Sequence, residues 1–375
     1  PLTKNGDYLN GSHRVSVCIN LKKKVFVLNT GLSAYSPTDY SFFYKKAVQI
    51  NVIEKALKNY LEYLDGVYIA FIWPSAYGNT SKINKIIKNK IYYKEIKLNS
   101  IGAHNLLAEV YKDQNWIGNS KNNYKGTIGK LKECFKDFNR PLRLIVFQER
   151  SHSDVIKIKD KIRNIFKIGK HSIHITDTKN EMLELSKIVF NKNGIHFLNN
   201  ARPFKYKSSE LKLINFKKYL FQKKVDLNKV VIYGSFVMEV YGIRKARDID
   251  FLNIQNKSKN SKLVNKTILE NSKLELADLV YDDNNFFEFY GLKFVSFHET
   301  YKIKKMRNEK KDIRDLRLMK SYLKNDLLTV IRIRFNQYVY FMSIFIKVKI
   351  IEFLKIIKIH SVVKKIYNSV LNFFK

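Results

Sequence analysis

The sequence predicts an α/β protein built from two domains and a helical tail. Apolar runs of strand length alternate with helical patterns over the first 200 residues, which is typical of an α/β domain. A polar segment containing Pro203 then interrupts the pattern, and the composition changes again after residue 326. Since 375 residues are more than one core usually takes, we expect domains at 1–203 and 204–325 and a tail at 326–375.

The first domain is expected to hold a largely parallel sheet, because its strands alternate with helices. Strands are expected at Val15–Ile19, Lys24–Leu28, Gly66–Trp73, Leu142–Phe147, His171–Ile175 and Ile195–Leu198. Helices are expected at Tyr44–Leu64, after the fourth strand through Ile165, and from Thr178 to Phe190. Thr178 and Glu181 have the spacing of a capping box, which predicts the start of the last helix.

The second domain is expected to begin within Asn199–Ser208, a polar stretch that contains Pro203. A helix at Leu211–Gln222 and a strand at Val230–Tyr233 should follow. Asn256–Asn265 is rich in Lys, Asn and Ser, and we expect it to form a surface loop.

Composition excludes a globally disordered chain and leaves two explanations for the high positive charge. Hydrophobic residues make up 45% and aromatic residues 14%, which is enough for real cores. The formal charge of +37 would attract nucleic acid, nucleotide phosphates or an anionic membrane surface. Lys, Asn and Ile are abundant from end to end, however, which is also typical of an AT-rich genome. Both explanations of the charge stay open.

The cysteines and the hydropathy pattern indicate a cytoplasmic protein. Cys18 and Cys134 lie far apart without a CxxC pattern, which argues against a disulfide framework and a structural zinc site. No signal peptide opens the chain, although it begins at Pro1 rather than Met, so its true start stays undetermined. No run of 18 uncharged apolar residues occurs, so no transmembrane helix is predicted.

The segment with candidate catalytic residues is Val230–Leu252, VVIYGSFVMEVYGIRKARDIDFL. Gly234 lets the backbone approach a phosphate, and Ser235 opens a helix whose first N–H groups are free. Asp248 and Asp250 would point to the same face of a strand, because side chains alternate along it. Two such carboxylates suit Mg²⁺ or Mn²⁺, and a pair of ions roughly 3.5–4 Å apart would clamp the attacking and leaving oxygens of an in-line displacement.

Gly234-Ser235, twelve intervening residues and Asp-Ile-Asp together resemble the signature of the DNA polymerase beta-like nucleotidyltransferase superfamily. The wider wording, YGIRKARDIDFL followed by GLKFVSF and KKMRNEKKDIRDLRLM, is similar to nucleotidyltransferase-like proteins of bacterial surface-polysaccharide gene clusters. The resemblance covers about a third of the chain. It implies a mixed-sheet catalytic domain, a metal held by Asp248 and Asp250, and phosphate binding by Gly234 and Ser235.

The superfamily usually adds a third carboxylate from a neighbouring strand, as a metal ligand or general base. Asp278 lies in the apolar run LELADLVYDD, and Glu288 lies on the first arm of an expected hairpin that turns near Gly291. Either one would complete the site. If neither does, the domain would bind its ligand without turnover.

Four cations lie on a helical stretch after this hairpin: Lys304, Lys305, Arg307 and Lys311. The resemblance implies that Lys305 or Arg307 neutralises charge on a leaving pyrophosphate. The alternative is a solvated helix face on which three acids pair with these cations. Those acids are Glu309, Asp312 and Asp315.

The first domain carries one distinctive string, GKHSIHITDT at 169–178. In a strand, His171 and His174 would face opposite ways, so they are poorly placed as a metal pair. Thr176, Asp177 and the following helix could form a sugar or phosphate site at the end of the strand. The alternative is a buried strand with a well-capped helix, and the role of 1–203 stays unassigned. Trp116 could similarly cover a ligand or anchor a loop.

The tail predicts one or two basic, strongly apolar helices. Acids are nearly absent, and six lysines recur among Ile, Phe, Val and Leu: Lys347, Lys349, Lys355, Lys358, Lys364 and Lys365. Such helices lie in the headgroup layer of an anionic membrane or pack on the catalytic domain. Membrane binding would make the protein peripheral on the inner face of the cytoplasmic membrane.

These patterns favour a nucleotidyltransferase of surface-polysaccharide biosynthesis. Its partners would be a nucleoside triphosphate and a sugar, glycan or lipid-linked acceptor. The alternatives are a glycosyltransferase that uses a nucleotide-sugar through the DxD motif, and an inactive nucleotide-binding remnant. Nucleic acid is not favoured, because no recognisable nucleic-acid module is present and no basic patch with interleaved aromatics occurs outside the tail.

Overall fold

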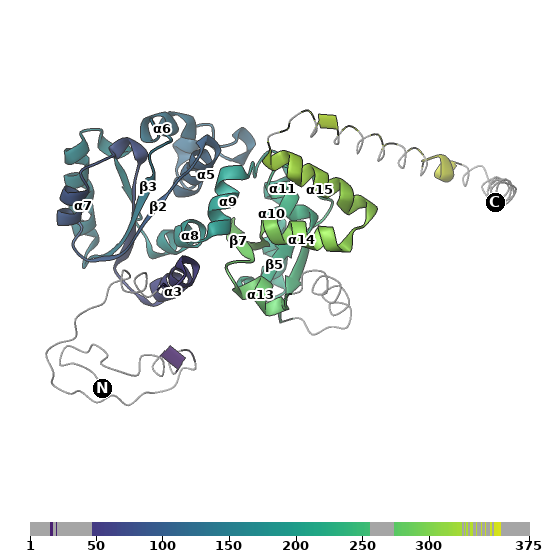
Figure 1. The fold of residues 1–375 in the computed structure, drawn as a ribbon, viewed down its shortest axis with the longest axis horizontal. Coiled ribbons are helices and arrows are strands. Elements are labelled where there is room, and N and C mark those ends of the chain that lie inside the picture. Colours follow the sequence, from purple (N-terminus) through teal and green to yellow (C-terminus); the bar gives the residue numbers. More distant parts are fainter. Residues whose placement is uncertain are drawn as a thin grey trace, which may run out of the picture.

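The computed structural model describes residues 47–255 and 274–324, together with residues 16, 17, 20 and 326 and single positions between 328 and 353. These residues form a mixed α/β structure with two four-stranded sheets, which lie side by side with α8 and α9 between them (Figure 1). Most of the two strands predicted before residue 30, and the predicted loop Asn256–Asn265, lie outside the described residues. Ser16 and Val17, which are described, are helical, so a strand is wrong at those two positions.

The first sheet has the order β2-β3-β1-β4. Its strands are β1 (Val67–Ile72), β2 (Lys90–Ile96), β3 (Leu142–Gln148) and β4 (Ile173–Ile175). Its helices are α3 (Ile50–Tyr63), α4 (Thr80–Ile86), α5 (Ser100–Val110), α6 (Thr127–Cys134), α7 (His152–Phe166) and α8 (Lys179–Val189). Short 3₁₀ turns lie at Pro74–Ala76, Asn115–Ile117, Ser120–Asn122 and Gly169–His171.

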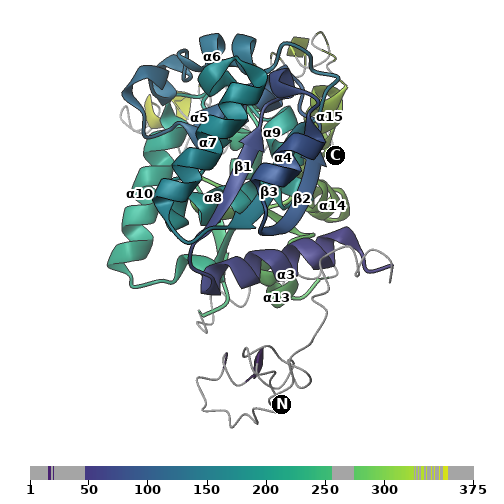
Figure 2. The same cartoon turned by 90° about the vertical axis from the view of Figure 1, so that its left-hand side faces the viewer.

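The expectation of a largely parallel sheet is wrong, because β1 pairs antiparallel with β3 and β4, and β2 pairs antiparallel with β3. The sequence pattern could not give the strand direction, because the strand β1 is buried on both faces. Ile69 and Phe71 pack with α3, α5 and α8, whereas Ala70 and Ile72 pack with α4 and α7. Figure 2 shows α4 and α7 in front of the sheet, with α8 and α9 behind it. A strand covered on both faces is apolar throughout, whichever way its neighbours run.

The strand expected at Ile195–Leu198 is also wrong, since these residues lie in helix α9 (Lys192–Asn200). Asn191 caps this helix by accepting from the N–H groups of Asn193 and Gly194. The helix packs between the two cores: Leu198 joins the core of the first sheet, and Phe197 joins that of the second. A run of four residues, three of them apolar, cannot distinguish a strand from such a helix.

The second sheet has the order β6-β5-β8-β7 and is mixed, as expected. Its strands are β5 (Val230–Tyr233), β6 (Asp250–Asn253), β7 (Phe286–Phe289) and β8 (Leu292–Val295). Its helices are α10 (Ser208–Gln222), α11 (Ser235–Val240), α13 (Leu276–Tyr281), α14 (Phe297–Arg307) and α15 (Lys310–Leu323), and a 3₁₀ turn spans Leu227–Lys229. β5 runs antiparallel to β6 and parallel to β8, and β7 and β8 form the expected hairpin.

Polar contacts join the two halves of the chain. The side chain of Asn193 on α9 donates to the carbonyl groups of Asp283 and Asn284 and to that of Phe286 on β7. Lys58 on α3 forms an ion pair with Asp283, with 2.6 Å between Nζ and Oδ2. The two sheets and their helices are therefore linked by hydrogen bonds to backbone carbonyl groups and by an ion pair between side chains. The boundary predicted at 203/204 stays a prediction.

The described tail positions from 328 to 353 are helical. Eight of them carry exposed apolar side chains at intervals of three or four residues: Leu328, Ile331, Phe335, Val339, Met342, Ile346, Ile350 and Phe353. That interval places them along one face of a helix. Within the part of the chain that the structure describes, no helix has the length and apolar character needed to cross a membrane.

Candidate active site

A pocket of about 250 Å³ lies where the ends of β5 and β6 meet α14 and α15. It is lined by Tyr233, Gly234, Ser235, Asp248, Asp250, Thr300, Ile303, Lys304, Arg307, Lys311 and Asp315. One wall carries the two predicted aspartates and the Gly-Ser turn, and the opposite wall carries three cations. The pocket therefore brings together Gly234, Ser235, Asp248, Asp250 and Arg307, five of the residues predicted from the sequence.

Gly234 forms the turn between β5 and α11 with a φ of +73°, a conformation that favours glycine. Tyr233 pairs with Asp250 in the β5–β6 register, so the turn lies directly beside the start of β6. A Cβ built on Gly234 would lie 3.4 Å from Asp250 Oδ2. The absence of a side chain thus keeps the backbone open next to the carboxylate.

Asp248 and Asp250 are both exposed and both line the pocket. Only Asp250 lies in β6, because the strand begins there, and Asp248 lies in the bend that precedes it. Desolvation within the pocket raises the pKa of Asp250, and the neighbouring charge of Asp248 raises it further. The two carboxylates repel each other, so a cation between them would be stabilising.

The opposite wall carries Lys304 and Arg307 from α14 and Lys311 from α15. Lys304 is buried, with Nζ 2.8 Å from Asp315 and 3.3 Å from Asp312. Arg307 donates twice to Asp312, at 2.6 and 2.7 Å, and this hydrogen bonding raises its pKa. The ion pairs hold the cations at the pocket wall in fixed positions.

Arg244 belongs to the site although the sequence did not indicate it. Its guanidinium donates to both oxygens of Asp315, and Nη2 also donates to Ser235 Oγ at 2.8 Å. Ser235 is thereby tied to α15. The sequence does not predict the contacts of Arg244 with Asp315 and Ser235, because Arg244 is only one of several cations in GIRKARDID.

Glu239 and Lys212 hold the segment that carries Arg244 and Asp248. The fully buried Glu239 accepts from the backbone N–H of Ala246 at 2.6 Å, and Lys212 donates to the carbonyl of the same residue at 2.7 Å. Glu239 and Lys212 also pair with each other at 2.9 Å. Both backbone polar groups of Ala246, which lies between Arg244 and Asp248, are therefore fixed.

Thr300 is a second residue that sequence reasoning missed. Thr300 lines the pocket, and its buried hydroxyl has no hydrogen-bond partner among the described residues. A buried hydroxyl without a partner costs about 1–3 kcal/mol. A ligand oxygen in the pocket would remove that cost.

The structure places both candidates for a third carboxylate away from this pocket. Asp278 lies on helix α13, not on a strand, and its carboxylate accepts from the N–H of Glu275 in a capping box. Glu288 lies on β7 beside Lys187, at 3.8 Å, and lines a separate cavity near His104. Burial raises the pKa of Glu288. Lys305 is exposed on α14 and is not among the residues that line the pocket, because its neighbour Lys304 faces inward instead.

The two aspartates fit a divalent cation whose remaining coordination positions are filled by oxygens of the substrate. Among the described residues, no group of three or more His, Cys, Asp or Glu side chains is arranged to hold a metal. Asp315 lines the pocket, but Arg244 and Lys304 occupy its oxygens. Mg²⁺ is commonly bound by one or two carboxylates together with substrate phosphates, rather than by a complete protein cage. Asp248 and Asp250 match that requirement.

No family model, no curated protein and no solved structure matches this chain. What the protein does must therefore be inferred from the chemistry of its own residues.

Proposed function

We propose that the protein is a metal-dependent nucleotidyltransferase with a nucleotidyltransferase-like fold over residues 204–325. It would transfer a nucleotidyl group from a nucleoside triphosphate to a sugar, glycan or lipid-linked acceptor in bacterial surface-polysaccharide biosynthesis. The strongest support is that Gly234, Ser235, Asp248 and Asp250 line one pocket together with three cations.

The phosphates of the nucleotide would lie between the two walls. Gly234 leaves the backbone open to them, and the hydroxyls of Ser235 and Thr300 line the same space. Lys304, Arg307 and Lys311 would balance the negative charge that grows on a leaving pyrophosphate. Lys304 and Arg307 are already held by ion pairs, so little ordering is needed when the ligand binds.

Asp248 and Asp250 would hold Mg²⁺ or Mn²⁺. Such an ion supplies Lewis-acid polarisation of a phosphoryl oxygen. By holding the ion, the two aspartates would help to orient the nucleotide. Binding of the ion would also relieve the mutual repulsion of the two carboxylates.

A second candidate is a nucleotide-binding domain without turnover. It is favoured by the positions of Asp278 and Glu288, neither of which lines the pocket. Asp315 does line it, but its ion pairs with Arg244 and Lys304 leave no free base at that position. If the protein does catalyse transfer, the acceptor hydroxyl would have to lose its proton to solvent, to Asp248 or Asp250, or to a group supplied with the acceptor.

The tail would place the enzyme on the inner face of the cytoplasmic membrane. Support comes from the exposed apolar side chains along one helix face and from Arg332 and Lys349, which are also exposed on that helix. A basic amphipathic helix of this kind binds in the headgroup layer of anionic membranes.

The decisive experiment measures Mg²⁺- and Mn²⁺-dependent turnover of the four ribonucleoside triphosphates with sugar, sugar-phosphate and lipid-linked acceptors. The test variant is Asp248→Asn/Asp250→Asn, and the control is Asp160→Asn, an exposed acid on α7. Asp278→Asn and Glu288→Gln accompany them. Pyrophosphate release that is lost in the test variant and kept in the other three would support the proposal and the placement of the site.

Other outcomes assign the remaining possibilities. Release of a nucleoside diphosphate from a nucleotide-sugar, with loss in the same double variant, would move the function to glycosyl transfer. Metal-dependent nucleotide binding without any product, measured by calorimetry, would favour the binding domain. Loss of activity in Asp278→Asn with an unchanged unfolding midpoint would contradict the position of that residue outside the site.

A further inference from the structure

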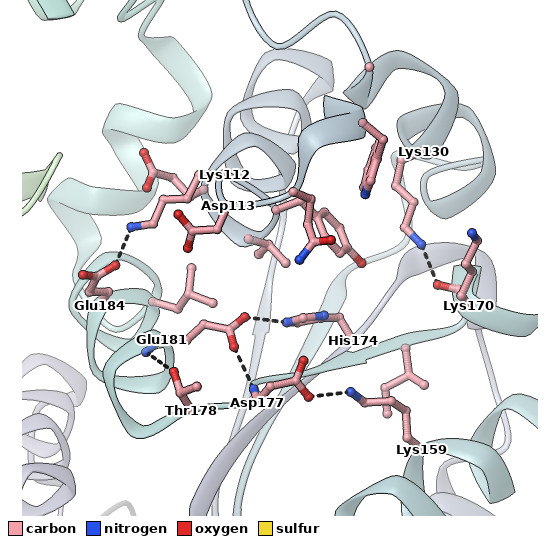
Figure 3. Close-up of a pocket in the computed structure, with 18 of the residues that line it drawn as sticks. Lys112, Asp113, Lys130, Lys159, Lys170, His174, Asp177, Thr178, Glu181 and Glu184 are labelled. Atoms are coloured by element: carbon pink, nitrogen blue, oxygen red, sulfur yellow. Dashed lines mark hydrogen bonds and ion pairs between the residues drawn. The ribbon is translucent and has the colours of Figure 1, made fainter. Parts of the chain in front are cut away.

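A separate cavity of about 650 Å³ lies in the first half of the chain, at the carboxyl end of β4. It is enclosed by α5, α6, α7 and α8, and it shares no lining residue with the pocket of Asp248 and Asp250. Figure 3 shows Lys130 and Lys170 at one end of the cavity, and Asp113 and Glu184 at the other end, where Lys112 also lies. A cavity with this polarity suits a ligand that has two different ends.

The cationic end carries more positive charge than the protein neutralises. Lys130 is 8% exposed, and its Nζ donates to the carbonyl of Lys170 at 2.7 Å and lies 5.3 Å from the centroid of the Tyr111 ring. Among the described residues, no carboxylate lies within ion-pair distance of Lys130 or of the Lys170 ammonium. Burial lowers the pKa of Lys130, and the charges of Lys170 and Arg163 lower it further. An anion at this end would relieve that repulsion.

Two buried nitrogen atoms at the same end have no hydrogen-bond partner in the described part of the chain. They are Nε of Arg163 and Nδ1 of His171, and both residues line the cavity. Buried polar atoms are nearly always paired in folded proteins, with protein, water or ligand. Arg163 and His171 thus form a wall next to Lys130 in which not every polar group is paired.

The acidic end offers acceptors for hydroxyl groups. Asp113 is exposed at the cavity and forms no ion pair within the described residues, whereas Glu184 pairs with Lys112. Between the two ends, Glu181 accepts from the N–H of Asp177 at 2.7 Å and lies 2.8 Å from His174 Nε2. This bridge fixes the floor of the cavity. A carboxylate accepts hydrogen bonds but donates none, so it selects hydroxyl or amino groups.

An aromatic surface lies at the rim. Trp116 is 49% exposed, lines the cavity, and has its ring centroid 5.3 Å from that of Tyr111. A half-exposed indole beside charged side chains presents a flat apolar face and an N–H donor to a bound ring.

We propose that this cavity binds a phosphorylated sugar. The phosphate would lie against Lys130, Lys170 and Arg163. The hydroxyl groups would face Asp113, and the sugar ring would lie beside Trp116. The phosphorylated sugar can come free or as part of a nucleotide-sugar, and the volume accommodates both. This binding does not depend on nucleotidyl transfer, and it would give residues 1–203 a role.

The test measures binding of glucose 1-phosphate, UDP-glucose, glucose and inorganic phosphate to the full chain by calorimetry, with tryptophan fluorescence in parallel. The chain has two tryptophans, and Trp73 is fully buried, so a ligand-induced change should come from Trp116 and disappear in Trp116→Phe. Lys170→Gln and Lys130→Met should each weaken phosphosugar binding about tenfold or more. Lys157→Gln, an exposed lysine on α7 that does not line the cavity, is the matched control.

Further variants and ligands test the acidic end, the independence of the two sites and the source of the phosphorylated sugar. Asp113→Asn should weaken the phosphosugar and leave inorganic phosphate unchanged, because the phosphate does not reach that end. Asp248→Asn/Asp250→Asn should bind glucose 1-phosphate as the wild type does, which keeps this result independent of the proposed activity. Tighter binding of UDP-glucose than of glucose 1-phosphate would identify a nucleotide-sugar as the source. Absence of phosphosugar binding at millimolar concentration, or equal binding by Lys170→Gln and the wild type, would overturn the proposal. If Lys130→Met does not fold, the exposed Lys170 carries the test alone.

Discussion

Arg244 and Asp315 form a bidentate ion pair although 71 residues separate them, with Nε and Nη2 2.6 and 2.7 Å from the two carboxylate oxygens. Because Nη2 also donates to Ser235, the pair joins helix α15 to the turn that follows β5. Lys304 donates to the same carboxylate at 2.8 Å. The pocket walls are therefore held together by one buried carboxylate that has two cationic partners.

Replacing Arg244 with glutamine should lower both stability and ligand affinity. Asp315 is almost fully buried and would keep only Lys304, so we expect the free energy of unfolding to fall by about 2 kcal/mol. Ser235 would lose its tether, and nucleotide affinity should fall as well. Urea unfolding and calorimetry measure the two effects. Lys157→Gln should change stability by less than about 0.5 kcal/mol, and an equally small change in Arg244→Gln would refute the structural role.

Acid should destabilise the protein through Asp312 and Asp315. Burial favours their neutral forms, but hydrogen bonds from Arg307 and Arg244 and the charge of Lys304 lower both pKa values below 3.8. A lowered pKa in the folded state stabilises the protein at pH values above the unfolded pKa, and that stability is lost as pH falls through the folded pKa. We therefore expect the loss below about pH 4.

The matched variant for this prediction is Asp312→Asn. It should be less stable than the wild type at pH 7 and should lose less stability between pH 4 and pH 2, because it lacks one of the two titrating groups. Unfolding in urea at several pH values gives both numbers. Parallel pH curves for the two proteins would show that Asp312 does not contribute.

Alanine at Gly234 should impair ligand binding more than its backbone strain explains. Its φ of +73° disfavours alanine, which costs about 1 kcal/mol, and the new Cβ would lie 3.4 Å from Asp250 Oδ2. Gly78 is the control, because its φ is +82° and a Cβ there would meet nothing within 4 Å. Both variants should lose similar stability, and only Gly234→Ala should lose metal-dependent nucleotide affinity. Equal affinities in the two variants would count against a site at Gly234.

An acidic residue on the apolar face of the tail should weaken membrane binding. Phe335→Asp would place a charge on a face that we expect to enter the headgroup layer. Phe221→Asp is the control, because Phe221 is an even more exposed phenylalanine on α10. Sedimentation with phosphatidylglycerol vesicles should fall for the first variant only, and neutral phosphatidylcholine vesicles should bind weakly throughout. Similar sedimentation of both variants would remove the tail from the membrane proposal.

Several local elements could be predicted because their causes lie within a few residues. The strand Val230–Tyr233, the hairpin near Gly291 and the helix that starts after Thr178 all occur. Even here one detail differs: Thr178 accepts from the N–H of Glu181 as expected, but the Glu181 side chain reaches the N–H of Asp177 and His174 instead of closing the box. A nearby partner outside the motif competes for the carboxylate.

The sequence by itself determined the local chemistry of the site. It placed a glycine where the backbone needs a positive φ, a serine beside it, and two aspartates close together, one in the bend before the next strand and one at its first residue. Only the tertiary structure decided which cations and acids join them. Lys304 rather than Lys305 faces the pocket, Asp315 rather than Asp278 lies beside it, and Arg244 links its walls. The sheet direction was decided in the same way. Such choices depend on how helices and strands far apart in the chain pack, and residue spacing records only contacts between near neighbours.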